Sequence, residues 1–246
     1  MLYRFVSVVA ITLVVSCCAG TGSASRVDGP ISSSPEPTAD LSRPDVDNVV
    51  DSVVRIIGFG CGSPSFGSGF AVLGDLVVTS GHLVTGRDPD SLGVLLIDGT
   101  EVGATLVGFD FDLDLAALLL DEAILEPVTV ITNVPVVSGV AIGIRSERGE
   151  PTINEVEFDV DAPVTVNWDG VFRDTESQFN GLRIFGAIRR GDSGSGLFIN
   201  DTDVIGLIHS KNRGGAPRGY AVGGSDIVDF IDGIDRTVEV VADRCA

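Results

Sequence analysis

The chain has 246 residues, enough for one or two compact domains, and its formal net charge is −19 at pH 7. A surface this acidic repels phosphate backbones, which argues against a nucleic-acid-binding role. Apolar residues make up 44% of the chain and glycine occurs 31 times. Many glycines between short Val, Ile and Leu runs predict an all-β protein with tight turns.

The N-terminus, residues 1–17, has the pattern of an export signal. Arg4 precedes an uncharged apolar run over residues 5–15, which is too short to span a bilayer comfortably. The run ends in Val-Val-Ser-Cys, which resembles a bacterial lipobox with Cys17 as the residue that takes the lipid. Two alternatives stay open: Cys18 is the acceptor, or an ordinary signal peptide is cleaved and the chain is secreted. Each of them predicts an extracytoplasmic protein, attached to the membrane by a lipid anchor only or not at all.

Residues 18–48 are rich in Ser, Pro, Gly, Thr and Asp and contain few apolar side chains. Such a segment cannot bury enough surface to fold, so it predicts a disordered tether. The folded domain is then expected over residues 49–246.

Within that domain, short apolar runs alternate with turn residues, which predicts strands arranged as a sandwich or a pair of barrels. Asp98-Gly99 lies between two β-rich runs and is a strong hairpin signal. A short helix is predicted through Ile231, with Ser225 as its N-cap. The predicted strands are residues 53–57, 69–73, 76–79, 92–97, 101–107, 115–120, 136–144, 156–160, 182–188, 196–199, 204–208 and 219–222.

The candidate chemistry rests on His82, Asp114 and Ser193. A serine hydroxyl is a weak nucleophile until a neighbouring base takes its proton. A neutral His does this near pH 7, and a buried carboxylate fixes its tautomer and stabilises the imidazolium. Each residue taken alone is more often structural, but together, in His-Asp-Ser order, they predict a chymotrypsin-type triad. Asp112 competes with Asp114, because alternate residues of a strand face the same side.

The residues that flank these three resemble trypsin-like serine proteases. Gly-Asp-Ser-Gly at 191–194 is similar to their nucleophile motif, and Asp-Leu-Ala at 114–116 to their Asp segment. Thr-Ser-Gly-His at 79–82 is similar to their Thr-Ala-Ala-His, with departures at two small positions. The resemblance implies that the backbone N–H groups of Gly191 and Ser193 form an oxyanion hole.

The resemblance covers about residues 50–245. It implies a chymotrypsin-like double β-barrel with a short C-terminal helix. The first barrel is expected at about residues 49–133 and the second at about residues 134–246, with the triad in the crevice between them.

A narrower resemblance comes from Val-Val-Arg-Ile-Ile-Gly at 53–58, Cys61 and Gly-Ser-Gly-Phe at 67–70. These look like the start of the periplasmic protease domain of actinobacterial MarP-type proteases, which carry a disulfide from this region to the C-terminus. The resemblance therefore implies a Cys61–Cys245 bridge, and exported chains can keep such bonds. Two free thiols are the alternative. That family has several transmembrane helices before its protease domain, so its stress role is not carried over.

Ala187 and Ile188 are expected at the base of the substrate pocket, by their offset from Ser193. Neither is an acid that would hold Arg or Lys, so trypsin-like specificity is not expected. His209 is expected in the pocket wall; a bias towards acidic side chains, as in glutamyl endopeptidases, is the alternative. Neither a metal site nor a cofactor is predicted. We expect a serine endopeptidase acting on proteins or peptides, with a non-catalytic surface binding protein and an esterase as rivals.

Overall fold

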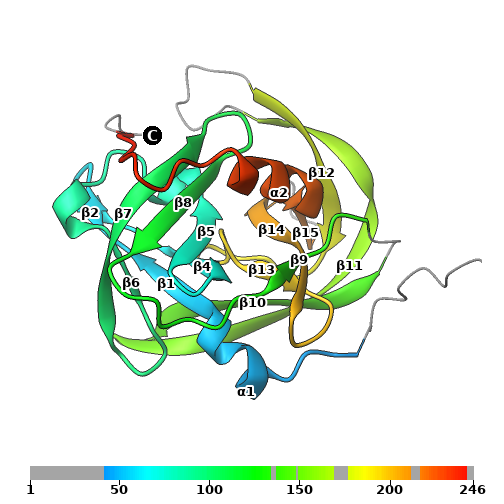
Figure 1. The fold of residues 1–246 in the computed structure, drawn as a ribbon. Helices are drawn as coiled ribbons and strands as arrows, with labels where there is room; N and C mark the ends of the chain where they lie inside the picture. Colours follow the sequence, from blue (N-terminus) through cyan, green and yellow to red (C-terminus); the bar gives the residue numbers. More distant parts are fainter. Residues whose placement is uncertain (1–41, 134–136, 148, 169–176, 212–216, 243–246) are drawn as a thin grey trace, which may run out of the picture. The chain divides into compact units, whose positions relative to one another are not determined.

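The computed structural model describes residues 42–133, 137–147, 149–168, 177–211 and 217–242 (Figure 1). The chain divides into two units, Met1–Thr38 and Ala39–Ala246, and all described residues belong to the second. Cys17, Cys18 and Cys245 lie outside the described residues, so the lipid acceptor and the disulfide pairing stay predictions. Within the described ranges, no helix has the length and apolar character needed to cross a bilayer.

The first half of the folded part is a closed barrel in the strand order β1-β4-β5-β8-β7-β6. Strand β8 is apolar throughout and β5 carries only two hydroxyl side chains at its end, because both strands are buried on both faces. Each neighbouring pair in this barrel is antiparallel. The strands are β1 (Val53–Ile57), β4 (Gly67–Leu73), β5 (Leu76–Ser80), β6 (Gly93–Leu95), β7 (Glu101–Asp110) and β8 (Leu115–Leu120).

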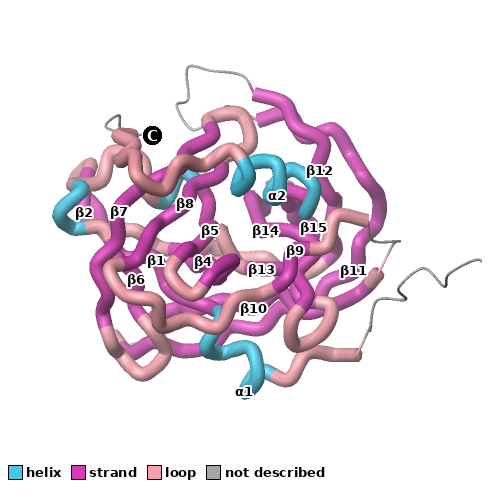
Figure 2. Tube along the Cα trace, viewed as in Figure 1, coloured by secondary structure: helices cyan, strands magenta, loops and turns pink. Residues whose placement is uncertain are grey.

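The second half is a sheet in the order β13-β10-β11-β12-β15-β14-β9, and a further pairing of β13 with β14 closes it into a second barrel (Figures 1 and 2). Strand β9 is added outside this closure, parallel to β14. The strands are β9 (Thr129–Val130), β10 (Ser138–Glu147), β11 (Glu150–Trp168), β12 (Ser177–Phe185), β13 (Gly196–Phe198), β14 (Asp203–Lys211) and β15 (Arg218–Gly223). The predicted double barrel is confirmed.

The short elements lie around the barrels. The predicted C-terminal helix is confirmed as α2 (Gly224–Asp232), but its N-cap is Gly223 and not Ser225. The Ser225 hydroxyl is directed away from the helix end and donates to the carbonyl of Thr132 at 3.2 Å. The others are α1 (Val46–Val49), the 3-10 turns η1 (Val50–Ser52), η2 (Gly81–Leu83) and η3 (Pro89–Ser91), and the small hairpin β2 (Phe59–Gly60) with β3 (Ser63–Pro64).

The Asp98-Gly99 turn is confirmed between β6 and β7. Gly99 has a φ of +88°, and the Asp98 carboxylate accepts from the backbone N–H of Thr100 at 2.8 Å. The largest departure is the β11–β12 hairpin, where the sequence suggested only residues 156–160 and 182–188. In the outer parts of both strands, polar residues stand between the apolar ones, which gives only a weak strand signal in the sequence. Backbone pairing between the two strands extends each of them beyond its apolar centre.

Cys61 is disulfide-bonded. Its sulfur lies 3.3 Å from the carbonyl oxygen of Gly86, whose N–H donates to the carbonyl of Ala242 at 2.6 Å. The C-terminal segment therefore passes beside Cys61 three residues before Cys245. This proximity favours the predicted Cys61–Cys245 bridge.

Candidate active site

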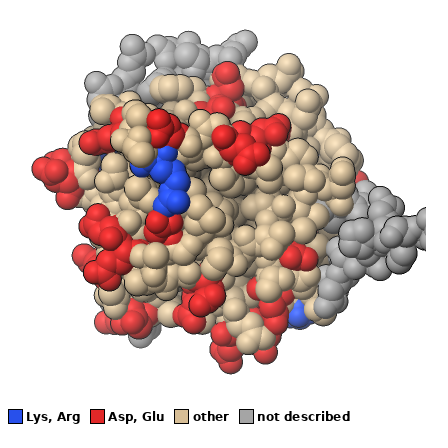
Figure 3. Space-filling view, viewed as in Figure 1, with Lys and Arg blue, Asp and Glu red and all other residues tan. Residues whose placement is uncertain are grey.

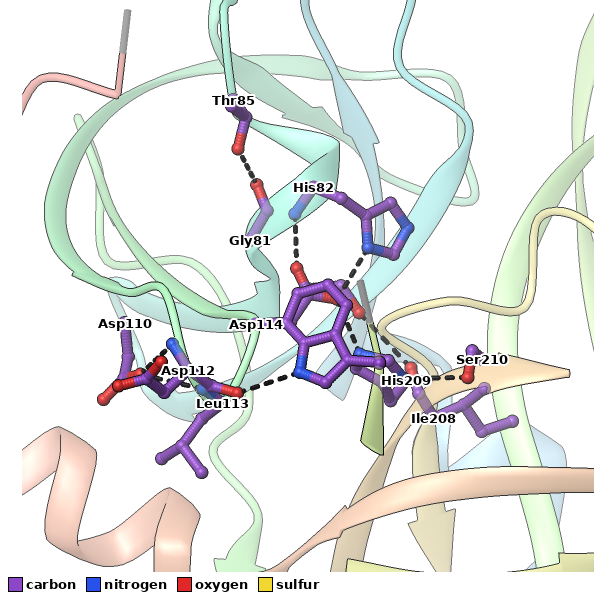
Figure 4. A network of polar contacts seen from close by, with 12 residues as sticks. Gly81, His82, Thr85, Asp110, Asp112, Leu113, Asp114, Ile208, His209 and Ser210 are labelled. Atoms are coloured by element: carbon purple, nitrogen blue, oxygen red, sulfur yellow. Dashed lines mark hydrogen bonds and ion pairs between the residues drawn. The ribbon is translucent and has the colours of Figure 1, made fainter. Parts of the chain in front are cut away.

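His82 and Asp114 form the best-defined pair of the site (Figure 4). One carboxylate oxygen of Asp114 lies 2.7 Å from Nδ1 of the His82 ring. The other accepts from the His82 backbone N–H, also at 2.7 Å. Because one carboxylate contacts both the ring and the main chain of His82, it fixes the orientation of the imidazole. Nδ1 then carries the proton, and Nε2 is left as the basic nitrogen.

Strand ends position both residues. His82 lies in the 3-10 turn that directly follows β5, and Asp114 directly precedes β8, the neighbour of β5 in the barrel. The Gly81 N–H donates to the Asp114 carbonyl at 2.8 Å, which continues the pairing of these two strands. Asp114 has a φ of +56°, a strained conformation for a residue with a side chain.

Asp112, the competing acid, does not lie on a strand with Asp114 as the sequence suggested. Both belong to the turn between β7 and β8, and the positive φ of Asp114 breaks the alternation. Asp112 is exposed, and its carboxylate accepts from the Ser177 hydroxyl at 3.0 Å. Asp114 is fully buried and faces His82. The structure therefore brings Asp114, and not Asp112, to the histidine.

The pKa of His82 is raised above its usual value. Burial opposes protonation of the ring, but the negative charge of Asp114 and its hydrogen bond outweigh that effect, and Arg87 contributes a smaller opposing charge. A base with a raised pKa is a stronger proton acceptor, which is the property needed to activate a hydroxyl.

Ser193 lies in the turn that precedes β13. The turn is held by three backbone hydrogen bonds, from the N–H groups of Asp192, Gly194 and Ser195. Within the described part of the chain, the N–H groups of Gly191 and Ser193 donate to no protein acceptor. Two unpaired N–H groups on either side of a turn residue are available to a ligand oxygen.

The two halves of the site meet at Gly67. A Cβ on Gly67 would lie 2.3 Å from the Leu83 side chain, next to His82, and 2.8 Å from the Ser193 carbonyl oxygen. That carbonyl also accepts from the Ser68 N–H at 2.8 Å. Among the described residues, the Ser193 hydroxyl and His82 Nε2 share no hydrogen bond. Such contacts are commonly loose before substrate binds.

Asp192 is held by groups that sequence reasoning missed. Its buried carboxylate accepts from Arg145 Nε and Asn154 Nδ2, both at 2.9 Å, and from the Arg189 N–H at 2.7 Å. Arg145 also forms an ion pair with it. These contacts anchor the nucleophile turn to β10 and β11 of the second barrel. Residues 145 and 192 are 47 positions apart, so no local pattern could have paired them.

His209 is buried next to the Asp114 carboxylate. Its ring is 3% exposed, packs edge-on against Trp168 at 4.7 Å between centroids, and tilts towards Phe179 at 5.2 Å. Nε2 lies 3.4 Å from the Asp114 oxygen that contacts His82. Burial lowers the pKa of His209, the Asp114 charge opposes this and the His82 charge adds to it. The ring is therefore neutral near pH 7.

Ala187 and Ile188 lie between β12 and the nucleophile turn. Ala187 is exposed, whereas Ile188 packs against the second barrel's core. The cavity described beside the nucleophile turn is lined by other residues, so the pocket role of Ala187, Ile188 and His209 stays a prediction.

Comparison with known families supports the same chemistry. The Trypsin-like peptidase domain matches residues 67–207. The chain is 27% identical over 172 residues to "Serine protease Do-like HtrA" of Lactococcus lactis subsp. cremoris, covering 65% of this chain and 41% of that protein. It is 30% identical over 144 residues to the Bacillus subtilis protein of the same name, covering 55% and 30% respectively. The chain thus spans less than half the length of the curated relatives it matches.

Solved structures support the fold. The Rv3671c (MarP) protease of M. tuberculosis in its active form superposes with a TM-score of 0.72 at 20% identity, covering 85% of this chain and 96% of that one. A serine endoprotease from Yersinia pestis superposes with a TM-score of 0.59 at 20% identity, covering 76% and 64%.

Proposed function

Because the chain belongs to the trypsin-like peptidase family, we propose that it is a serine endopeptidase in which Ser193, His82 and Asp114 form the catalytic triad. The observation that carries the proposal is the double contact of one buried carboxylate with the ring and main chain of His82. That contact presents Nε2 as the free base, which is the arrangement a serine nucleophile needs.

The reaction proceeds by acyl transfer. The Ser193 oxygen attacks the peptide carbonyl as its proton passes to His82 Nε2, and Asp114 stabilises the imidazolium. His82 returns that proton to the leaving amine as the carbon–nitrogen bond breaks, which leaves an acyl-enzyme on Ser193. Water then attacks the ester, with His82 again taking and returning a proton, and releases the acid product.

The unpaired N–H groups of Gly191 and Ser193 support an oxyanion hole. The developing oxyanion would accept from both, and each such donor contributes about 3 kcal/mol of transition-state stabilisation in enzymes of this type. The buried Asp192 carboxylate holds the same turn through Arg145 and Asn154. An internal arginine therefore supplies the positive charge that positions this turn.

A fluorophosphonate probe and a protein substrate test the proposal together. The wild-type protein is expected to be labelled at Ser193 and to cleave casein, and Ser193→Ala is expected to lose both. Ser195→Ala is the matched control, because this buried hydroxyl lies two residues away and has no hydrogen-bond partner among the described residues. Labelling without peptide cleavage favours an esterase, and absent labelling of the folded protein favours a non-catalytic binding protein.

We further propose that the protease domain works outside the cytoplasm on the tether of residues 18–48, with a lipid on Cys17. The lipobox-like sequence supports the lipid, and a relative from Bartonella henselae, 44% identical over 59 residues, is named a probable periplasmic endoprotease. That match covers 24% of this chain and 11% of the relative. Radiolabelled palmitate is expected to label the wild type but not Cys17→Ser; labelling lost only in Cys18→Ser moves the acceptor by one residue.

A further inference from the structure

A cavity of about 430 Å³ opens beside the nucleophile turn. Its lining includes Gly191, whose N–H group has no acceptor among the described residues, and Gly67, where an added Cβ would lie 2.8 Å from the Ser193 carbonyl oxygen. The cavity therefore adjoins the turn that carries the proposed nucleophile. Its volume falls in the range of ordinary ligand sites, which hold one or a few side chains.

Among the residues whose side chains the structure describes, three arginines line this cavity and no acidic residue does. Arg55 and Arg190 both lie over the ring of Phe66, with their guanidinium carbons 6.0 and 5.6 Å from its centroid. Cation–π contact of this kind holds a guanidinium in place while leaving its N–H groups free to bind an anion. Arg145, the third, is already paired with Asp192.

Arg55 and Arg190 have no carboxylate partner among the described residues, although the chain carries 35 acidic and only 16 basic residues. On the face drawn in Figure 3, most of the charged surface is acidic. Arg43, Arg183 and Arg236 each pair with a carboxylate, Arg87 donates to backbone carbonyls, and Arg218 lies over the ring of Phe185. Two unpaired like charges near one aromatic ring repel one another, and an anion placed between them relieves that repulsion.

The elements around the cavity are β1, the start of β4, the end of β10 and the nucleophile turn. Gly191, in that turn, and Gly67, at the start of β4, place the cavity next to the segment that carries Ser193. A substrate bound for attack by Ser193 therefore presents residues near its scissile bond to this cavity.

We infer that this cavity is a substrate subsite, and that Arg55 and Arg190 select substrates with a carboxylate near the scissile bond. The inference rests on the proposed protease function and adds a substrate class to it. The carboxylate is either an Asp or Glu side chain or the C-terminus of the substrate, and both present the same planar acceptor to a guanidinium.

The test uses full-length protein and internally quenched peptides built on a sequence taken from its own casein cleavage products. Matched peptides carry Glu or Gln at each of the first three positions on either side of the scissile bond, with amidated C-termini. At one position the Glu peptide is expected to have a kcat/KM about tenfold above its Gln partner, the scale of about 1.4 kcal/mol for a charge-assisted contact. The preference is expected to shrink between about 0.05 M and about 1 M NaCl, because salt screens partly exposed charges.

A second pair of peptides, neutral throughout and ending in a free or an amidated C-terminus, separates the two carboxylate sources. A preference for Glu within the chain assigns the side chain. A preference for the free acid, in a peptide that ends within three residues of the cut, assigns the terminus. No preference for any carboxylate within three residues of the scissile bond overturns the inference.

The double variant Arg55→Gln/Arg190→Gln is expected to bring the Glu-to-Gln ratio to about one. The ratio is measured within one protein sample, so it does not depend on how much of that sample is folded. Arg43→Gln/Arg183→Gln removes the same charge from pairs elsewhere and is expected to keep the wild-type ratio. A ratio that persists in the first variant overturns the inference. Cleavage without carboxylate preference refutes the subsite alone, whereas no cleavage and no fluorophosphonate labelling refute the protease and the subsite with it.

Discussion

Nε2 of His209 lies 3.4 Å from Oδ2 of Asp114, the same oxygen that contacts Nδ1 of His82 at 2.7 Å. One buried carboxylate thus has an imidazole on either side. The other nitrogen of His209 lies 2.8 Å from the Ser210 hydroxyl, which can donate to it and leave the proton on Nε2. Nε2 of His209 forms no hydrogen bond within the described part of the chain, so its proton stabilises the Asp114 charge through the electric field of the N–H dipole alone.

This relationship predicts that His209 positions the triad. His209→Phe keeps an aromatic ring against Trp168 and Phe179 but removes the N–H group, so kcat/KM for a peptide is expected to fall by less than about tenfold, because the lost contact is weaker than a hydrogen bond to a charged group. His209→Gln retains an N–H donor and is expected to recover part of the loss. Equal kcat/KM for wild type and His209→Phe would show that Asp114 does not need this contact.

The His82–Asp114 pair predicts the pH dependence of activity. Only neutral His82 can accept the Ser193 proton, and the raised pKa of His82 places the loss of kcat/KM on acidification above pH ~6.5. Asp114→Asn is expected to move this limb to lower pH and to reduce kcat by about 10⁴-fold. Asp112→Asn is the control and is expected to change neither; the reverse pattern would identify Asp112 as the triad acid.

The His82–Asp114 pair also makes the stability of the fold depend on pH, in the opposite direction to activity. The folded-state pKa of His82 is raised, so protonated His82 stabilises the fold at pH values below the unfolded pKa of ~6.5. That contribution is expected to be lost as pH rises through the folded pKa. The difference in unfolding free energy between wild type and Asp114→Asn, followed by denaturant titration across this window, measures it.

The Arg145–Asp192 contact predicts that the nucleophile turn depends on one internal cation. Arg145→Met leaves the Asp192 carboxylate, which is 1% exposed, without its counter-charge, and the free energy of unfolding is expected to fall by about 3 kcal/mol. Fluorophosphonate labelling of Ser193 is expected to slow, because the turn loses its anchor. Adding Asp192→Asn removes the buried charge and is expected to restore part of the stability; no recovery would point to packing as the role of Arg145.

Gly194 lies at a position of the nucleophile turn where a larger residue would clash with the backbone. An added Cβ would lie 1.9 Å from the Ser68 carbonyl oxygen, and the φ of Gly194 is +83°. Gly194→Ala is therefore expected to lower stability by more than ~2 kcal/mol in thermal unfolding. Gly99→Ala is the matched control, with a φ of +88° and no atom within 4 Å of the added methyl, and is expected to cost about 1 kcal/mol. Equal losses would mean that backbone conformation, and not the clash, sets the penalty.

The expected Cys61–Cys245 bridge predicts that replacing either cysteine has the same effect on stability. Cys61→Ser and Cys245→Ser are each expected to lower the unfolding free energy by about 3 to 5 kcal/mol, and the double variant by no more than either single one. Peptide mapping without reductant checks the linkage directly. Additive losses, or a bridge mapped to Cys17 or Cys18, would contradict the pairing.

Much of the fold follows from local patterns. The Asp98-Gly99 turn and the apolar strand runs need only neighbouring residues, because turn type and alternation are local properties. The predicted bounds of the strands at 156–160 and 182–188, and the predicted N-cap of α2, were wrong for the opposite reason. Their bounds depend on what lies across the sheet, such as the Thr132 carbonyl that accepts from the Ser225 hydroxyl.

The order of His82, Asp114 and Ser193, with the short motifs around them, was enough to predict the family, because nucleophile chemistry needs those side chains and those tight turns. The tertiary structure decided which acid faces His82, through the positive φ of Asp114 in a turn that resembled a strand. It also paired Asp192 with Arg145 and brought Arg55 and Arg190 to one phenylalanine ring. These contacts join residues far apart in sequence, and only the closure and packing of two barrels brings such residues together.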